Sequence, residues 1–315
     1  MRRLLVLLCM LPLLAAPPKT GRARFRIPVW VKSRTGESVA PVTAKDLTAT
    51  LQGSSSRVLS VSPPGDALIT LLVLDLTEGL TRAETAKEAL IGETGQLPET
   101  AWVGLLRAQD GLKVILDPTK DRTAVADAVR AAPVSGKAGL LDTVETMEGI
   151  ADAILTKAAV RLAVFYVTDS SVENYREDLT NPVINSSDPH DLSRRFPEQL
   201  VQERIAKLQK SLARRQTPLF IVHLIYRSDR MNEAYQNGLK QLAETTGGTS
   251  LFCRSVAEIP EAIKKTFETI TSYQSVCLEL PARLPESAEV QLLLTGNDNE
   301  DRILSYRTRF TVGRE

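Results

Sequence analysis

Residues 68–79 constrain the fold of this chain more than any other stretch. An apolar run, Leu-Ile-Thr-Leu-Leu-Val-Leu, ends abruptly at Asp75, and apolar residues at helical spacing follow from Leu80. A continuous apolar run that leads into a helix is typical of a parallel strand buried on both faces. Ligands of such sheets lie beyond the carboxyl ends of the strands, so Asp75 and Thr77 are the first candidate site residues.

Strand and helix patterns alternate from residue 67 to residue 272. Apolar runs predict further strands at 101–106, 111–116, 160–168 and 219–225. The short polar linker at 107–110 predicts a hairpin, and therefore one antiparallel edge. Helical spacing separates the other runs. We therefore expect an α/β domain with a doubly wound, mostly parallel sheet and helices on both faces.

Small β segments flank this domain on both sides. Residues 24–65 alternate apolar and polar side chains and contain turn sequences, as strands of a half-buried sheet do. Residues 273–315 have the same character, with a polar hairpin tip predicted at 297–301 between strands at 290–294 and 304–310.

The first residues have the layout of a secretory signal peptide. Arg2 and Arg3 precede an apolar block at 4–14, and Ala15-Ala16 forms a small-residue cleavage site. The block is too short to span a membrane, so we expect residues 1–16 to be removed and the mature chain to be secreted or periplasmic, without a transmembrane segment. An uncleaved membrane anchor is the less favoured alternative.

The chain has 39 basic and 38 acidic residues, so its charges nearly cancel. This balance gives no electrostatic support for a nucleic-acid partner.

Two cysteines, Cys253 and Cys277, remain after export. An oxidising compartment would permit one disulfide between them, closing a loop of about 24 residues. Two buried free thiols are the alternative, and the sequence leaves both open.

Three further patterns resemble a known family. The first is Leu-Leu-Val-Leu-Asp75-Leu-Thr77-Glu-Gly79, which resembles an apolar strand followed by Asp-x-Ser-x-Ser. The second is Ala138-Gly-Leu-Leu-Asp142, which resembles Thr-Ala-Leu-Tyr-Asp. The third is Val164-Phe-Tyr-Val-Thr-Asp169, which resembles a strand ending in Thr-Asp-Gly. In this order they resemble a von Willebrand factor A (VWA) domain. The exported chain as a whole resembles the acidobacterial VWA-related family.

This resemblance implies a degenerate metal-ion-dependent adhesion site. Asp75, Thr77 and Asp169 match ligand positions of the family, whereas Gly79 and Ala138 stand where two side-chain hydroxyls belong; Ser170 replaces the usual glycine after Asp169. Magnesium prefers six oxygen ligands, several of them water. We therefore expect either no cofactor or a weakly bound Mg²⁺. If no metal ion is bound, Asp75 and Asp169 would instead cap backbone amides at the ends of their strands.

The sequence favours a binding module over an enzyme. It contains no phosphate-binding glycine loop, dinucleotide fingerprint or His-Glu-x-x-His motif, and His190 and His223 are its two histidines. His223 lies in a predicted buried strand and is expected to be a core residue. We expect a protein partner to bind through the 170–197 loop at the end of the Asp169 strand. The alternatives are an envelope assembly component, whose β segments dock together or onto another subunit, and a cysteine-dependent hydrolase using Cys253.

Overall fold

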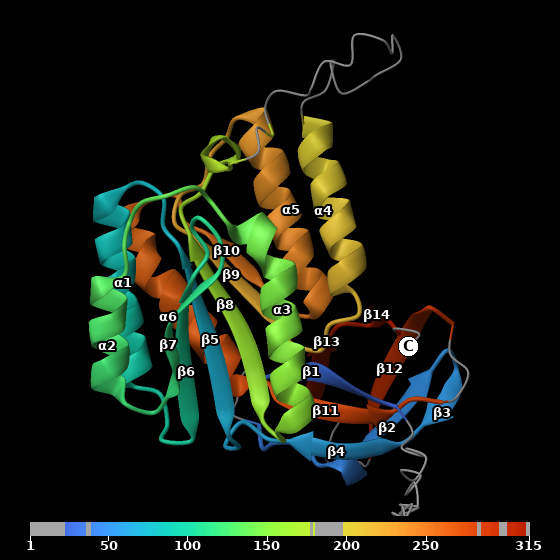
Figure 1. The fold of residues 1–315 in the computed structure, drawn as a ribbon. Helices are drawn as coiled ribbons and strands as arrows, with labels where there is room; N and C mark the ends of the chain where they lie inside the picture. The colour runs from blue at the N-terminus through green and yellow to red at the C-terminus, as the bar shows by residue number, and fades with distance from the viewer. Residues whose placement is uncertain are drawn as a thin grey trace, which may run out of the picture.

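The computed structural model describes residues 23–35, 39–176, 179, 198–281, 285–295 and 301–312. These residues form an α/β domain and a smaller β-sandwich (Figure 1). The predicted signal peptide, His190 and most of the 170–197 loop lie outside the described residues.

The α/β domain is built on a six-stranded sheet with the order β10-β9-β8-β5-β6-β7. Its strands are β5 (Leu68–Asp75), β6 (Ala101–Arg107), β7 (Lys113–Thr119), β8 (Arg161–Thr168), β9 (Leu219–His223) and β10 (Ser250–Phe252). β5 lies inside the sheet and pairs in parallel with β6 and β8, while β7 runs antiparallel to β6. The mostly parallel sheet and its antiparallel edge confirm the predicted fold class.

Three helices cover each face of this sheet (Figure 1). One face packs against α1 (Leu80–Gly95), α2 (Arg122–Ala131) and α6 (Ile259–Ser272), and the other against α3 (Leu140–Lys157), α4 (Glu198–Leu212) and α5 (Arg230–Thr246). The apolar spacing of the sequence predicts most inward positions correctly. Leu80 is an exception, because it begins α1 at the carboxyl-end edge of the sheet and is 69% exposed.

The two flanking β segments form one sandwich. One sheet contains β1 (Arg24–Ser33), β4 (Val58–Ser62), β11 (Gln274–Glu279) and β13 (Arg302–Tyr306). The other contains β2 (Leu47–Leu51), β3 (Ser54–Ser56), β12 (Ser287–Leu294) and β14 (Arg309–Thr311). An apolar core drawn from both ends of the chain lies between the sheets. The end segments therefore dock on each other rather than forming independent units.

The predicted hairpin at the C-terminal end forms only in part. The segment predicted as one strand, 304–310, is divided between β13, which pairs with β1 in the opposite sheet, and β14, whose residues 309–310 pair antiparallel with residues 288–289 of β12. The predicted strand at 290–294 pairs with β2 instead. Alternation of side chains predicts that a segment is a strand, but it does not specify the partner, and here the partners come from the N-terminal segment.

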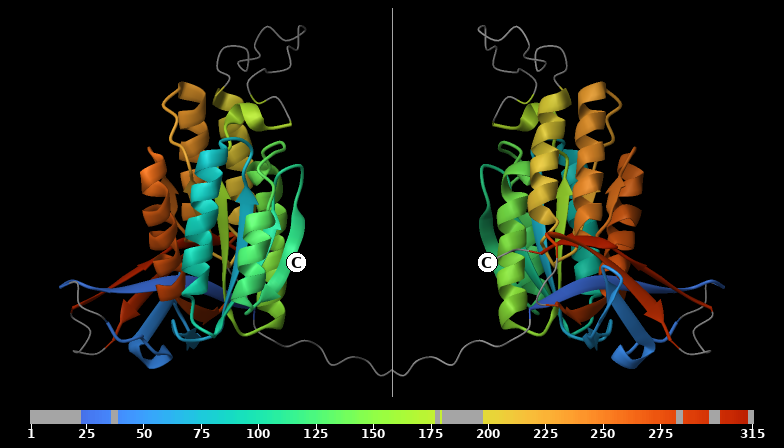
Figure 2. Two further views of the ribbon diagram at one scale, coloured as in Figure 1. Left: turned by 90° about the vertical axis from the view of Figure 1, so that its left-hand side faces the viewer. Right: turned by 90° about the vertical axis from the view of Figure 1, so that its right-hand side faces the viewer.

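A buried arginine joins the sandwich to the α/β domain. Arg161 begins β8 and is 1% exposed. Its guanidinium donates to the carbonyls of Thr271 (2.9 Å) and Tyr273 (2.9 Å), just before β11, and to those of Pro64 and Asp66 (3.2 Å), just before β5. Both connections are thus fixed at the amino ends of the parallel strands. The sandwich consequently leaves the carboxyl-end edge of the sheet free (Figure 2).

Candidate functional site

The adjacent strands β5 and β8 bring Asp75 and Asp169 together, as the sequence predicts. Asp75 pairs with Thr168 in the sheet register, and the Asp169 N–H lies 3.3 Å from the Asp75 carbonyl oxygen. Both residues are buried, with exposures of 0% and 1%. The two carboxylates therefore share one small region at the carboxyl-end edge of the sheet.

The Asp75 carboxylate is bonded to the start of α3. Oδ1 accepts the Gly139 N–H at 2.9 Å, and Oδ2 accepts the Leu140 N–H at 3.3 Å and the Thr168 hydroxyl at 3.0 Å. Burial raises the pKa of Asp75 to about 6 even though these hydrogen bonds lower it, and the nearby Asp169 charge raises it further. Asp75 thus acts as a cap for the first amides of the helix.

The Asp169 carboxylate is bonded to the turn after β5. Oδ1 accepts both the N–H and the hydroxyl of Thr77, at 2.7 and 3.0 Å, and Oδ2 accepts the Glu78 N–H at 3.2 Å. Burial raises the pKa of this carboxyl above its usual value, while the bonds from Thr77 and Glu78 oppose that shift. Thr77, the third predicted ligand, therefore donates its hydroxyl proton to Asp169.

Gly79 and Ala138 adjoin the residues whose amides bond to these carboxylates, Glu78 and Gly139. Gly79 has φ +73°, a left-handed conformation that favours glycine, and a Cβ there would lie 3.2 Å from Arg82 Nη1 and 3.5 Å from Asp169 Oδ2. Ala138 is buried next to Gly139. Neither residue has a side-chain oxygen. Within the described part of the chain, no group of three or more histidine, cysteine, aspartate or glutamate side chains is arranged to hold a metal ion.

A chain of buried hydroxyls extends from Asp75 and was not predicted. Thr168 Oγ1 lies 2.7 Å from Ser170 Oγ, which lies 2.8 Å from Tyr235 OH on α5. Tyr235 OH is 2.8 Å from Tyr175 OH, which in turn accepts the Leu141 N–H at 3.3 Å. The partners come from segments far apart in the sequence, so no local spacing indicates them. The network fixes residues 170–175 against the sheet.

His223 and Cys253 lie on neighbouring elements near this edge, and both are buried. His223 Nε2 is 2.8 Å from the Ser170 carbonyl oxygen, and its Nδ1 accepts the Ile225 N–H at 3.4 Å. Burial lowers the pKa of His223 to about 4, and burial raises the pKa of the Cys253 thiol to about 11. The prediction that His223 is a core residue agrees with its complete burial.

The disulfide alternative is wrong for this structure, in which Cys253 and Cys277 are free buried thiols. Cys253 precedes α6 at the carboxyl-end edge of the sheet, whereas Cys277 lies on β11 of the sandwich. The intervening helix of 14 residues is about 21 Å long. A disulfide requires Cα atoms within roughly 7 Å, so the helix keeps the two cysteines apart.

Side chains above the two carboxylates form an exposed surface, called here the rim surface and consisting of Glu78, Leu80, Tyr226, Arg227 and Arg254. Arg227 Nη2 lies 2.6 Å from Glu78 Oε1, which connects the β5 turn to the segment after β9. The Arg254 guanidinium lies 5.8 Å from the centre of the Tyr226 ring. Leu80 and Tyr226 are 69% and 39% exposed. Both apolar and charged side chains are thus exposed at this edge.

None of the helices in the described part of the chain has the length and apolar character needed to span a membrane.

Comparison with known proteins gives structural likenesses alone. No family model matches the sequence, and no curated protein matches it. The structure is similar to a von Willebrand factor type A protein from Catenulispora acidiphila, with 13% identity, a TM-score of 0.45 and coverage of 94% of this chain and 76% of that one. It is also similar to the vWF domain of the type V pili tip protein Mfa5 from Porphyromonas gingivalis, with 14% identity, a TM-score of 0.44 and coverage of 66% and 95%. Both of these proteins are described as von Willebrand factor type A domains.

Proposed function

We propose that this chain is an exported, non-catalytic binding module that recognises a protein partner through the rim surface, without a resident metal ion. One observation carries the proposal. Every side-chain oxygen of Asp75 and Asp169 already accepts at least one hydrogen bond from the chain itself. Carboxylates bonded in this way hold strand ends, turns and a helix start in place. They support a rigid surface around them.

The residues of this edge do not fit a resident Mg²⁺. Magnesium requires near-octahedral oxygen coordination at about 2.0–2.1 Å. Asp75 is inaccessible behind the amides of Gly139 and Leu140, and the Thr77 hydroxyl is directed to Asp169. Gly79 and Ala138 add no oxygen. The site is therefore best described as a degenerate adhesion site whose carboxylates have a structural role.

The environment of Cys253 and His223 supports a non-catalytic role over a cysteine-dependent hydrolase. A nucleophilic cysteine needs a lowered pKa and a base within reach. Here burial raises the pKa of Cys253 to about 11, and both ring nitrogens of His223 have backbone partners. A thiol of this kind stays protonated and inert near neutral pH.

The composition of the rim surface supports protein recognition. Arginine and tyrosine are enriched at protein interfaces, where they combine a large contact area with hydrogen bonding. Tyr226, Arg227 and Arg254 supply these groups, and Leu80, two residues after Glu78, supplies an exposed apolar side chain. Because the underlying strand ends are rigid, little conformational entropy would be lost on binding.

Export is part of the proposal, since the N-terminal sequence has the layout of a signal peptide. An intact-mass measurement on protein purified from the source organism tests it. We expect a mass that lacks residues 1–16. A mass corresponding to the complete chain would contradict export by cleavage.

Affinity capture from an envelope extract of the source organism tests recognition through the rim. We expect the wild-type chain to retain the same partner in EDTA and in excess Mg²⁺. Leu80→Glu should abolish this capture, because it places a charge in the apolar part of the rim surface. Leu293→Glu is the matched control, since Leu293 is 51% exposed on the sandwich. Unchanged capture by Leu80→Glu would contradict the rim, and loss of capture in EDTA would contradict metal independence.

A further inference from the structure

A cleft of about 790 Å³ lies where the α/β domain meets the sandwich. We call it the seam cleft; Ser250 and Leu251 of β10 and Lys265 of α6 line one side, and Trp30, Lys32 and Tyr306 of the sandwich line the other. It opens beside the amino end of β10, whereas Arg254 of the rim surface follows the carboxyl end of that strand. Clefts between structural units are common positions for ligands.

The edges of two sheets face this cleft. Within the described residues, β10 pairs with β9 alone and β13 with β1 alone, so each is the last strand of its sheet. The consecutive residues 249–251 and 305–307 line the cleft. Because the side chains of a strand point alternately to its two faces, a cleft over one face would be lined by every second residue. Consecutive residues line the seam cleft, which indicates that it faces the edge of each strand. The seam cleft therefore lies along main chain that can accept another strand.

The outer edge of β10 has unpaired backbone groups. Leu251 is opposite Val222, the Ile221 N–H donates to the Thr249 carbonyl at 3.0 Å, and the Cys253 N–H donates to the His223 carbonyl at 2.9 Å. Residues 249, 251 and 253 therefore bond towards β9, and the N–H and C=O groups of Ser250 and Phe252 point away from it. No described residue pairs with these outward groups, and the buried Ser250 Oγ also lacks a partner.

The charges of the cleft favour an acidic occupant. Lys32, Lys240, Lys265 and Arg307 line it, together with the carboxylates of Glu244 and Glu268, so the cationic side chains outnumber the carboxylates by four to two. Glu244 already lies 3.8 Å from Lys240, whereas Lys32, Lys265 and Glu268 form no ion pair with any residue that the structure describes. Trp30 and Leu251 provide apolar contact between these charges. Unmatched lysines beside a free strand edge would attract carboxylates to it.

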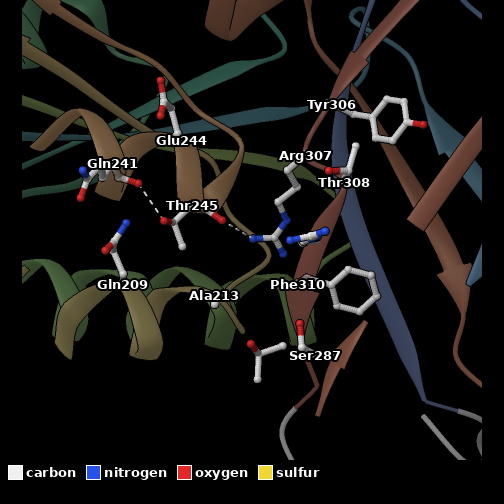
Figure 3. Close-up of a pocket in the computed structure, with 12 residues that line it drawn as sticks. Gln209, Ala213, Gln241, Glu244, Thr245, Ser287, Tyr306, Arg307, Thr308 and Phe310 are labelled. Carbon is white, nitrogen blue, oxygen red and sulfur yellow. Dashed lines mark hydrogen bonds between the residues drawn. The ribbon is translucent and has the colours of Figure 1, made fainter. Parts of the chain in front are cut away.

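A neighbouring pocket lacks these features. It has a volume of about 460 Å³ and lies between α4, α5 and β14 (Figure 3). There Arg307 Nη1 donates to the Thr245 carbonyl at 3.0 Å, and the Thr245 hydroxyl donates to the Gln241 carbonyl at 2.7 Å (Figure 3). The Thr311 N–H of β14 donates to the Ala213 carbonyl at 2.9 Å. The edge of β14 is thus partly occupied, in contrast to that of β10.

We propose that the seam cleft binds an extended, acidic segment of a partner protein, which adds to β10 as a further strand. Main-chain groups of the segment pair with the outward N–H and C=O groups of Ser250 and Phe252. Its carboxylates lie towards Lys32 and Lys265. This is a second binding surface, separate from the rim surface, and it does not depend on the function proposed above. Addition of a strand to a free edge is an established mode of peptide recognition.

Fluorescence anisotropy with defined peptides tests the charge requirement on the full mature chain. The probes are a labelled peptide of alternating glutamate and valine and its lysine–valine counterpart. We expect saturable binding of the acidic probe, weakened by salt, and none of the basic one. Lys32→Glu combined with Lys265→Glu should lower the affinity about tenfold or more. The matched control, Lys113→Glu with Lys120→Glu at the β7 edge, should leave it unchanged.

Substitution of Ser250 tests the strand pairing. Ser250→Pro removes one outward N–H at an edge position where proline is tolerated, and Ser250→Ala retains it. We expect the proline variant to bind the acidic probe several-fold more weakly than the alanine variant, with both folded by circular dichroism. If Ser250→Pro unfolds the chain, hydrogen exchange of the wild type is measured instead. We then expect the acidic probe to protect the Ser250 and Phe252 amides from exchange. Absence of saturable binding, insensitivity to the lysine substitutions, or equal affinities with unprotected amides would overturn the proposal.

Discussion

Asp169 Oδ1 accepts two hydrogen bonds from Thr77, one from its N–H at 2.7 Å and one from its hydroxyl at 3.0 Å. Two residues that resemble metal ligands in sequence are therefore bonded to each other. This contact fixes the turn after β5 to the end of β8. The carboxyl-end edge of the sheet is thus held by bonds within the chain, and the rim surface rests on it.

The role of Arg161 as a link between the two units can be tested by substitution. Arg161→Met should lower the free energy of unfolding by about 3 kcal/mol, because buried carbonyls before β5 and β11 lose their donor. Urea denaturation measures this change. Arg130→Met is the control, since Arg130 is exposed and pairs with Asp127, and should alter stability by less than about 0.5 kcal/mol. Equal effects of both variants would contradict the assigned role.

Gly139 is required for the close approach of α3 to the end of β6. A Cβ at this position would lie 1.9 Å from the Ala108 carbonyl oxygen, a clash between main-chain groups that no rotamer change can relieve. We expect Gly139→Ala to destabilise the chain by about 3 kcal/mol or more, because the helix start must move away from Asp75. Thermal unfolding measures the effect.

Gly92 provides the matched control for that substitution. It lies within α1, and a Cβ there would meet no atom within 4 Å. Gly92→Ala should therefore stabilise the chain by about 0.5–1 kcal/mol through helix propensity. A stable Gly139→Ala variant would show that α3 is not held as described.

Glu148 should make stability depend on pH. It lies on α3, is fully buried, and neither carboxylate oxygen has a hydrogen-bond partner among the described residues. Burial raises its pKa well above the ordinary value, the Asp152 charge adds to this, and Arg215 and Arg307 oppose it. The folded chain therefore keeps this proton at pH values where the unfolded chain has lost it, so its contribution to stability falls as pH rises above the ordinary glutamate pKa.

Glu148→Gln removes that titration. We expect urea denaturation to show a smaller loss of stability with rising pH for the variant than for the wild type. Glu145→Gln is the control, because Glu145 is half exposed on the same helix. Parallel pH profiles for Glu148→Gln and the wild type would contradict the assignment.

Features governed by local pattern could be predicted from the sequence. The run at 68–74 specifies a buried strand, and because β5 and β8 are parallel neighbours, Asp75 and Asp169 meet at the same edge. The antiparallel edge and the helices follow from the short linker at 107–110 and the apolar spacing. Leu80 departs from the pattern because it lies at the first turn of α1, beyond the edge of the core.

Features that depend on distant partners could not be predicted. Alternation identified the end segments as strands, but their pairing into one sandwich joins β1 to β11 across the whole α/β domain. Likewise, the resemblance identified Asp75 and Asp169, but the amides and hydroxyls that bind them come from separate segments. The Ser170–Tyr235–Tyr175 chain gives no sequence signal because hydroxyl contacts need no particular spacing.

We propose that Asp75 and Asp169 hold the edge of the sheet rather than a cation, and isothermal titration calorimetry of the mature chain with Mg²⁺, and then with Mn²⁺, tests this claim. We predict no saturable heat in the micromolar range near neutral pH, for the wild type or for Asp75→Ala. Micromolar binding by the wild type that disappears in Asp75→Ala would contradict the claim and restore a metal to the site.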